Sequence, residues 1–560
     1  MKAERLRELK VQGHALLNRR QFGIEAPPKA TIKAMTPAPS IWHTLRHRAF
    51  RMLWWSGAVY FIGNAMQSMS AAWMMVELTG SSFLAALVQT AVFMPMFLLS
   101  LPAGVLADIT DRARLITVAL TLQAVAGGVL AALLLGGVAG PATLLFLVFV
   151  AGSCTAMMSP AWNSTISDSI PRDELPQAIT TVSIAYNAAR AVGPAIAGFV
   201  FAHAGGAWNF ALAVLSTLFM LYTIRRWPPR PHPPSRLPPE RLWGGMLSAL
   251  RFARHSQTVL AQLVRTVAYS AAGSALWALL PVIGQRQLGL GAAGFGLLMG
   301  CLGTGAVLVG LFISRVRERI GLEALVLGGC LVFAVVMVIA AFSRSPAVVY
   351  VSLLLGGAAW MSAMSTFNIA TQTSVPPWVR ARALAMHTLC ALGAFAMGSA
   401  LWGAVSDILG LSFALCTAAA CMAGGMLLAK PFPLRMGDRQ DVTQAIPWDD
   451  LFIADEPAPE DGPVSVEIAY RIRVEDAPAF LEVVSQLRAP RRRDGATIWR
   501  VYRDLADPAR FVERFIVASW AEYLHQRARA TVADQELETQ VRRFLLPGES
   551  VTMAHYLAEL

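Results

Sequence analysis

One arginine lies where a charge is costly. Arg190 falls inside the apolar run 177–202, shortly before Gly193 and Pro194. A charged side chain near the centre of a bilayer costs at least about 2.5–3.5 kcal/mol, so it must face a cavity or a partner. Two interpretations stay open: Arg190 binds an anionic or catecholate-like substrate, or it forms a buried ion pair with a carboxylate. Arg190 is therefore the leading candidate for a substrate contact.

Other polar side chains interrupt the apolar stretches. Tyr186 and Asn187 are close to Arg190 in the sequence, Asn64 and Gln67 lie about one helical turn apart, and Asn368 falls near the end of a later stretch. Polar groups inside apolar spans predict a wet cavity, and hydrogen bonding between helices would explain each of them equally well. We place these five residues on a candidate substrate pathway.

A charged corner separates the second and third apolar stretches. Asp108 and Asp111 stand beside Arg112 and Arg114, and Gly104 precedes them. Carboxylates cap or pair at helix ends, arginines hold a corner on the positive side of a membrane, and glycine permits close helix approach. The corner is either a charged gate that closes one side of the protein, or a helix cap with topological arginines.

No pattern indicates a metal, a cofactor or direct use of ATP. The chain contains no Walker A sequence, and its six cysteines lie in apolar stretches without a C-x-x-C pair. The titratable residues of these stretches lie toward their ends, namely Glu77, Asp168, His203, His387 and Asp407. We expect no metal, no cofactor and no enzyme activity.

The composition is that of a membrane protein. The 560 residues are 55% hydrophobic and only 15% charged, with a mean hydropathy of +0.51, whereas soluble domains carry about 25% charge. A bilayer core takes roughly 20 apolar residues per helix. Twelve stretches predict twelve transmembrane helices: 50–77, 83–107, 113–137, 142–167, 177–202, 207–226, 259–284, 293–314, 321–342, 346–370, 382–407 and 411–430.

The arginines alternate with the spans. The net charge of +12 could suggest nucleic acid, but most arginines lie in the loops of one side, and the other side has little beyond Arg286 and Arg344. The arginine-rich side of a membrane protein faces the cytoplasm. We therefore expect a multi-pass protein of the inner or plasma membrane, with the lipid bilayer rather than nucleic acid as its partner and with both termini cytoplasmic.

Two halves of the membrane part repeat. A shift of 205 residues places Gly193 on Gly398 and Gly198 on Gly403. A segment rich in proline and arginine joins the halves and predicts a cytoplasmic linker. The expected domains are a basic leader (1–45), a six-helix bundle (46–228), the linker (229–255), a second six-helix bundle (256–432), an acidic linker (433–463) and a soluble domain (464–560).

The soluble domain alternates strands and helices. Val464, Val466, Ile468, Tyr470 and Ile472 alternate with Ser, Glu, Ala and Arg, which predicts a half-buried strand. Further strands are expected at 496–504, 511–519 and 551–557, and helices at 475–487, 521–530 and 534–545. This β-α-β-β-α-β order predicts a ferredoxin-like α+β fold.

Several motifs resemble one family of membrane proteins. The corner around Gly104, Asp108 and Arg112 is similar to the loop between helices 2 and 3 of major facilitator superfamily transporters, with Ile109 and Asp111 replacing the usual Arg and Gly. Within that superfamily, 187–194 (NAARAVGP) resembles the transmembrane secretion effectors, which include enterobactin exporters. Gly193, Pro194 and Gly198 resemble the exporter-type G-P-x-x-G pattern, with its last glycine displaced by one residue, and small residues here favour helix packing.

The resemblance implies a secondary exporter of small amphipathic molecules, such as siderophores or drug-like compounds. It implies two six-helix repeats, alternating access and protons as coupling ion, with Asp108 as the best carrier. The soluble domain resembles antibiotic-biosynthesis monooxygenase domains, several relatives of which are enzymes without a cofactor. Because 464–560 shows no cluster of acid, base and nucleophile, we expect a regulatory or homodimerising role for it rather than catalysis. The alternatives are a membrane-tethered sensor or enzyme that acts through this domain, or a nutrient importer.

Overall fold

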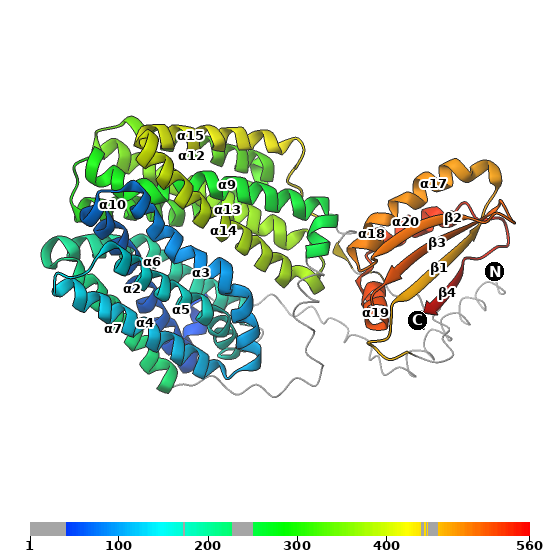
Figure 1. Cartoon of the computed structure of the whole chain (residues 1–560), viewed down its shortest axis with the longest axis horizontal. Coiled ribbons are helices and arrows are strands. Elements are labelled where there is room, and N and C mark those ends of the chain that lie inside the picture. The colour runs from blue at the N-terminus through cyan, green and yellow to red at the C-terminus, as the bar shows by residue number, and fades with distance from the viewer. Residues whose placement is uncertain are drawn as a thin grey trace.

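The structure is a computed structural model that describes residues 41–171, 174–226, 250–437, 442–443, 445 and 457–559. The predicted leader up to residue 40, Arg172, the linker up to residue 249 and most of the acidic linker lie outside the described residues. A helical part and a smaller sheet-containing part stand side by side (Figure 1). The long helices are α2 (Arg48–Thr79), α3 (Ser82–Ile109), α4 (Arg112–Leu135), α5 (Pro141–Asp168), α6 (Leu175–Ala204), α7 (Gly206–Arg226), α9 (Gln257–Val282), α10 (Ala292–Gly310), α12 (Leu322–Phe342), α13 (Pro346–Thr373), α14 (Pro377–Leu409) and α15 (Leu411–Gly425).

Eleven of the described helices are long and apolar enough to cross a membrane. The helix α2 has 32 residues but is not among the eleven, because its sequence mixes apolar side chains with Arg51, Asn64, Gln67 and Glu77. The prediction of a polytopic helical membrane protein with a small α+β domain is therefore confirmed at that level.

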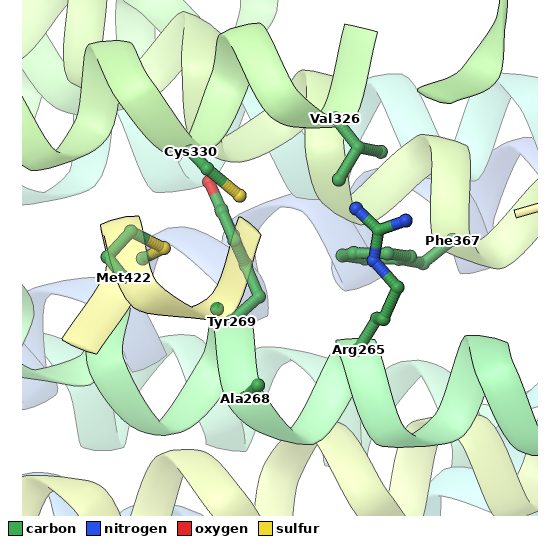
Figure 2. Close-up of a pocket in the computed structure, with 8 residues that line it drawn as sticks. Arg265, Ala268, Tyr269, Val326, Cys330, Phe367 and Met422 are labelled. Carbon is green, nitrogen blue, oxygen red and sulfur yellow. The ribbon is translucent and has the colours of Figure 1, made fainter. Parts of the chain in front are cut away.

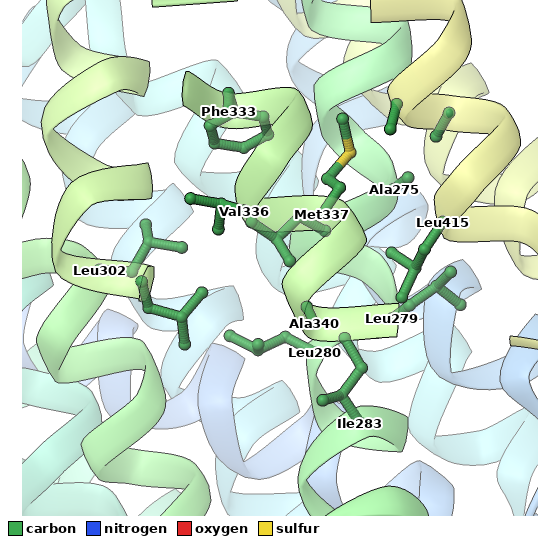
Figure 3. Close-up of a cluster of buried hydrophobic side chains, with 14 of the residues drawn as sticks. Ala275, Leu279, Leu280, Ile283, Leu302, Phe333, Val336, Met337, Ala340 and Leu415 are labelled. Atoms are coloured by element: carbon green, nitrogen blue, oxygen red, sulfur yellow. The ribbon is translucent and has the colours of Figure 1, made fainter. Parts of the chain in front are cut away.

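The helices form two halves, α2–α7 and α9–α15, that meet along two antiparallel pairs, α6 with α10 and α3 with α14. We call the end where α2 begins and α3 ends the arginine-rich end, and the opposite end the distal end. At the distal end, the largest apolar cluster crosses between the halves. It joins Met66, Met69 and Trp73 of α2 to α9, α10, α12 and α15, and Figure 3 shows the share of the latter four helices.

At the arginine-rich end the apolar clusters stay within one half each. Phe50, Ile116 and Ile166 belong to a cluster of the first half, and Phe252 and Val375 to a cluster of the second. A Cβ atom added to Gly104 would meet no atom within 4 Å. Among the described residues, the expected close helix approach at this glycine is therefore absent, and the apolar contact between the halves lies toward the distal end.

The C-terminal part is a four-stranded antiparallel sheet with the order β2-β3-β1-β4. Its strands are β1 (Val464–Arg471), β2 (Ile498–Arg503), β3 (Arg510–Val517) and β4 (Thr552–Leu557), and its helices are α17 (Ala477–Gln486), α18 (Arg488–Arg493), α19 (Trp520–Arg529) and α20 (Val532–Arg542). In β1 the alternate residues from Val464 to Tyr470 are buried, as the alternation predicts, because that face packs against apolar residues of α17, α19 and α20. The short helix α18 has no counterpart in the prediction.

The sheet domain contacts the second half of the helical part. Residues 250–255 are helical and precede α9. The Arg251 guanidinium donates to the Glu522 carboxylate at 3.1 Å and to the Gly495 carbonyl at 3.1 Å. The Arg493 guanidinium lies 5.7 Å from the ring centroid of Phe252. An ion pair, a hydrogen bond to the backbone and a ring contact thus hold the domain at the arginine-rich end.

Candidate functional site

Arg190 joins the two halves near the middle of α6. Its side chain is exposed in the structure, and its guanidinium lies 5.9 Å from the ring centroid of Tyr186 and 5.3 Å from that of Trp277. Tyr186 belongs to α6, whereas Trp277 belongs to α9 of the other half. Within the described part of the chain no carboxylate pairs with Arg190, so its charge is balanced only by aromatic faces.

An aromatic path extends from this arginine into both halves. Tyr186 packs edge-on against Phe61 of α2 with centroids 5.3 Å apart, and Trp277 packs against Trp360 of α13 at 6.1 Å. Trp360 in turn contacts Phe395 of α14 at 5.9 Å. The indole nitrogen of Trp277 is buried and has no hydrogen-bond partner among the described residues. Among the described residues, Arg190 and Trp277 are therefore two donors without a hydrogen-bond acceptor.

The other predicted pathway residues are spread more widely. Asn187 donates to the Ser183 carbonyl of its own helix at 2.8 Å. Asn64 is half-buried and Gln67 is buried on α2, where we find no hydrogen bond of either side chain to the described residues. Asn368 accepts a hydrogen bond from Gln372 at 2.6 Å, so its side-chain oxygen is bonded within α13.

The charged corner makes its described contacts inside the first half. Asp111 caps α4 by accepting from the Ala113 backbone at 2.8 Å, and Arg112 donates to Asp168 of α5 at 2.8 Å. Arg114 is 87% exposed and only 3.9 Å from Asp111. Asp108 lies near the end of α3, and its side chain is outside the described part. None of the described corner contacts reaches the second half in this conformation.

The glycines of the α6 motif lie at helix contacts. A Cβ at Gly193 would lie 2.7 Å from Cβ of Ala65 on α2, and a Cβ at Gly198 would lie 2.6 Å from the Ala292 carbonyl oxygen on α10. Pro194 lies between them, inside α6. Small residues therefore let α6 approach one neighbour from each half.

A second charged group was missed by the sequence reasoning. Arg265 of α9 is 3% exposed and forms an ion pair with Glu323 of α12, whose other oxygen accepts from the Leu434 backbone at 2.9 Å. Arg265, Tyr269 and Cys330 line a small pocket within the second half (Figure 2). The pocket does not include Arg190, so we treat this pair as structural. Arg265 lies inside the predicted span 259–284, so the argument from the cost of a charge that identifies Arg190 could have found it. The sequence does not show that Glu323 is its partner.

Similar folds are known among membrane transporters. The solved structure of the nucleoside transporter NupG is similar to this chain, with a TM-score of 0.56 and 14% identity, and the match covers 69% of this chain and all of that one. A bacterial homologue of the human lysosomal transporter Spinster is similar as well, with a TM-score of 0.52 and 15% identity over 71% of this chain and 97% of that one. This chain thus shares the fold of these two membrane transporters.

The sequence defines the family. The model of the transmembrane secretion effectors matches residues 39–560, and the chain belongs to that family. Its relatives include the staphyloferrin A transporter of Staphylococcus aureus, 21% identical over 64% of this chain and 89% of that protein. The multidrug efflux pump Tap of Mycobacterium tuberculosis is 27% identical over 62% and 85%, and the enterobactin exporter EntS of Citrobacter koseri is 24% identical over 65% and 86%.

Proposed function

We propose that this protein exports small amphipathic molecules that carry an anionic group, siderophores or drug-like compounds among them. The observation that carries the proposal is the unpaired Arg190, which projects from α6 toward Trp277 of the other half. An uncompensated charge in a membrane span is expensive unless it serves a ligand or an ion pathway. The siderophore and multidrug exporters among the relatives support the direction of transport.

The substrate class follows from the donors at this site. Arg190 offers up to five N–H groups and Trp277 one, and neither side chain has an acceptor among the described residues. A carboxylate or a deprotonated catechol supplies the missing acceptors, and the rings of Tyr186 and Trp360 would pack against its apolar body. The pathway then includes Asn187, with Asn64, Gln67 and Asn368 as more distant members.

Alternating access requires that the conformation described here be one of two. We take the arginine-rich end as cytoplasmic, with twelve helices spanning the membrane and both termini inside, so the structure is open toward the cytoplasm. In the opposite state the corner at Gly104, Asp108, Asp111, Arg112 and Arg114 closes against the second half. Protons drive the cycle, and Asp108 is the candidate carrier.

The C-terminal domain is proposed to be ferredoxin-like and to dimerise. The strand order β2-β3-β1-β4, with helices on one face, supports this proposal. The other face exposes Ile498, Tyr502 and Tyr556, each about half accessible, around a Glu467–Arg514 ion pair at 3.4 Å. A second copy of the same face would cover these side chains. Light scattering of the purified chain with Ile498→Asp and Tyr556→Asp should then show a monomer where the unmodified chain is a dimer.

Efflux from cells tests the transport proposal. Cells preloaded with an anionic dye, carboxyfluorescein, should lose it faster when they carry the protein, and Arg190→Ala should abolish that gain while the protein stays in the membrane. Arg344→Ala is the matched control, since Arg344 is exposed in the loop between α12 and α13. A protonophore should also stop efflux. Undiminished carboxyfluorescein efflux by Arg190→Ala would refute the site.

A further inference from the structure

Asp407 connects the two halves at the distal end. It lies close to the end of α14, and its carboxylate accepts from the Ser81 hydroxyl at 2.6 Å and from the Ser82 backbone N–H at 2.7 Å. Ser81 is the N-cap residue of α3. The carboxylate of the second half is therefore seated on the first turn of a helix of the first half.

The position of the Asp407 carboxylate at the N-terminus of α3 is electrostatically favourable. The N-terminus of a helix carries partial positive charge and unpaired N–H groups, which stabilise an anion. Ser81 already caps α3 by accepting from the Leu84 backbone at 3.1 Å. The helix therefore has its own local cap, and the additional bonds from Asp407 tie it to α14.

Neighbouring contacts depend on the same closure. Gly403, one turn earlier on α14, packs against Ala86 and Phe83 of α3, and Thr90 donates to the Ala396 carbonyl at 2.8 Å. The bonds of Asp407 and Thr90 thus join α3 and its N-cap residue to α14. The Arg286 guanidinium lies beside Gly80, where an added Cβ atom would come within 2.8 Å of it. Parting of α3 and α14 at the distal end would break both bonds of Asp407.

We propose that Asp407 is the latch of the distal gate, which holds that end closed while the site is open at the arginine-rich end and must release α3 before substrate can leave. The inference rests on the alternating access in the proposed function. It assigns the closing of each end to a separate aspartate: Asp407 near the end of α14 and Asp108 near the end of the antiparallel α3.

The latch can be tested without any substrate. In a variant of the full chain that lacks its six cysteines, Thr90→Cys places a thiol in the α3–α14 contact, and a membrane-impermeant maleimide added outside intact cells reports opening of the distal end. Asp407→Ala should increase the labelling rate at least about tenfold, because two charge-assisted hydrogen bonds are lost. Ser406→Ala changes a neighbouring buried hydroxyl that has no hydrogen-bond partner in the described part of the chain, and it should leave the rate unchanged.

Two further variants keep the test decisive. If Asp407→Ala does not reach the membrane, Asp407→Asn and Ser81→Ala remove part of the same contact and should each raise labelling by a smaller factor. Equal labelling of these variants and their parent would overturn the latch. Labelling measures gate opening alone, so a failure here is distinguishable from a failure of carboxyfluorescein efflux, which would instead overturn the proposed function.

Discussion

The two helix pairs that join the halves are held together differently. The α6–α10 contact is close packing of backbones, with Gly198 against Ala292, Gly296 against Pro194, and Gly303 against Ala191. Between these two helices we find no hydrogen bond or ion pair in the described residues. The α3–α14 contact also uses glycine, at Gly393 and Gly403, but adds the hydrogen bonds of Asp407 and Thr90.

The two kinds of contact respond differently when the helices move. Dispersion contacts weaken gradually as two helices roll over one another, so a packed pair can pivot while it stays in contact. Hydrogen bonds to a carboxylate are directional and are either formed or broken. We infer that α6–α10 serves as the pivot and α3–α14 as the closure that opens.

The largest effect is expected at the pivot. Gly198→Val would force a branched side chain against the Ala292 carbonyl oxygen, where a Cβ already lies at 2.6 Å. Overpacking of this kind costs about 1–3 kcal/mol or more, and we expect efflux to fall to background. The control is Gly328→Val on α12, where a Cβ meets nothing within 4 Å. Normal efflux by Gly198→Val would end the pivot interpretation.

A smaller effect is expected at the open end of the other pair. Gly104→Val fits this conformation, because a Cβ there has no neighbour within 4 Å, but it should obstruct closure of the arginine-rich end. Maximal efflux should fall about three- to tenfold, or about 1 kcal/mol in the barrier. The substrate concentration for half-maximal efflux should stay constant. A change confined to that concentration would argue against a role in closure.

A still smaller effect is expected from the hydrogen bond of Thr90 between α3 and α14. Thr90→Val keeps the shape of the side chain and removes only its bond to the Ala396 carbonyl, which is worth about 0.5–1.5 kcal/mol. We expect efflux to change by about twofold. Thr121→Val serves as the control, since its hydroxyl bonds within α4. If Thr90→Val had a larger effect than Asp407→Ala, the carboxylate would not be the main closure.

The smallest effect is expected where the sheet domain docks. The Arg251–Glu522 ion pair is partly exposed, and such pairs contribute about 0–1 kcal/mol. Arg251→Ala should make limited proteolysis of the domain in membrane vesicles about twofold faster, with efflux nearly unchanged. Arg254→Ala, an exposed neighbour, is the control. Complete loss of efflux in Arg251→Ala would mean that docking is part of the transport cycle.

The sequence predicts local features far better than contacts between distant segments. The alternation from Val464 to Ile472 predicts β1 and its buried face, because side chains of a strand point to opposite sides in turn. The helices likewise follow from apolar length. The order of strands in the sheet follows only by analogy, since alternation says nothing about which strands pair.

The candidate site shows where sequence reasoning stops. It identifies Arg190 from the cost of its charge, but not Trp277, which is distant in the chain and reaches Arg190 only through packing of the halves. It places Asp407 merely at the end of a span, because the role of that carboxylate depends on which helix N-terminus faces it. The ion pair between Arg265 and Glu323 is likewise a contact between two helices, and the sequence does not predict which residues of different helices meet.

The attachment of the sheet domain has a mechanical consequence. Its hydrogen bonds and ring contact described here join it to the helical residues 250–255 before α9, and thus to the second half. A rocking motion of that half would carry the attached domain with it. Because the domain lies beyond the ends of the helices, a small rotation of the helices would displace the domain over a larger distance. A molecule that binds the sheet domain, including a second copy of this chain, would therefore slow the rocking of the second half or favour one of its two positions.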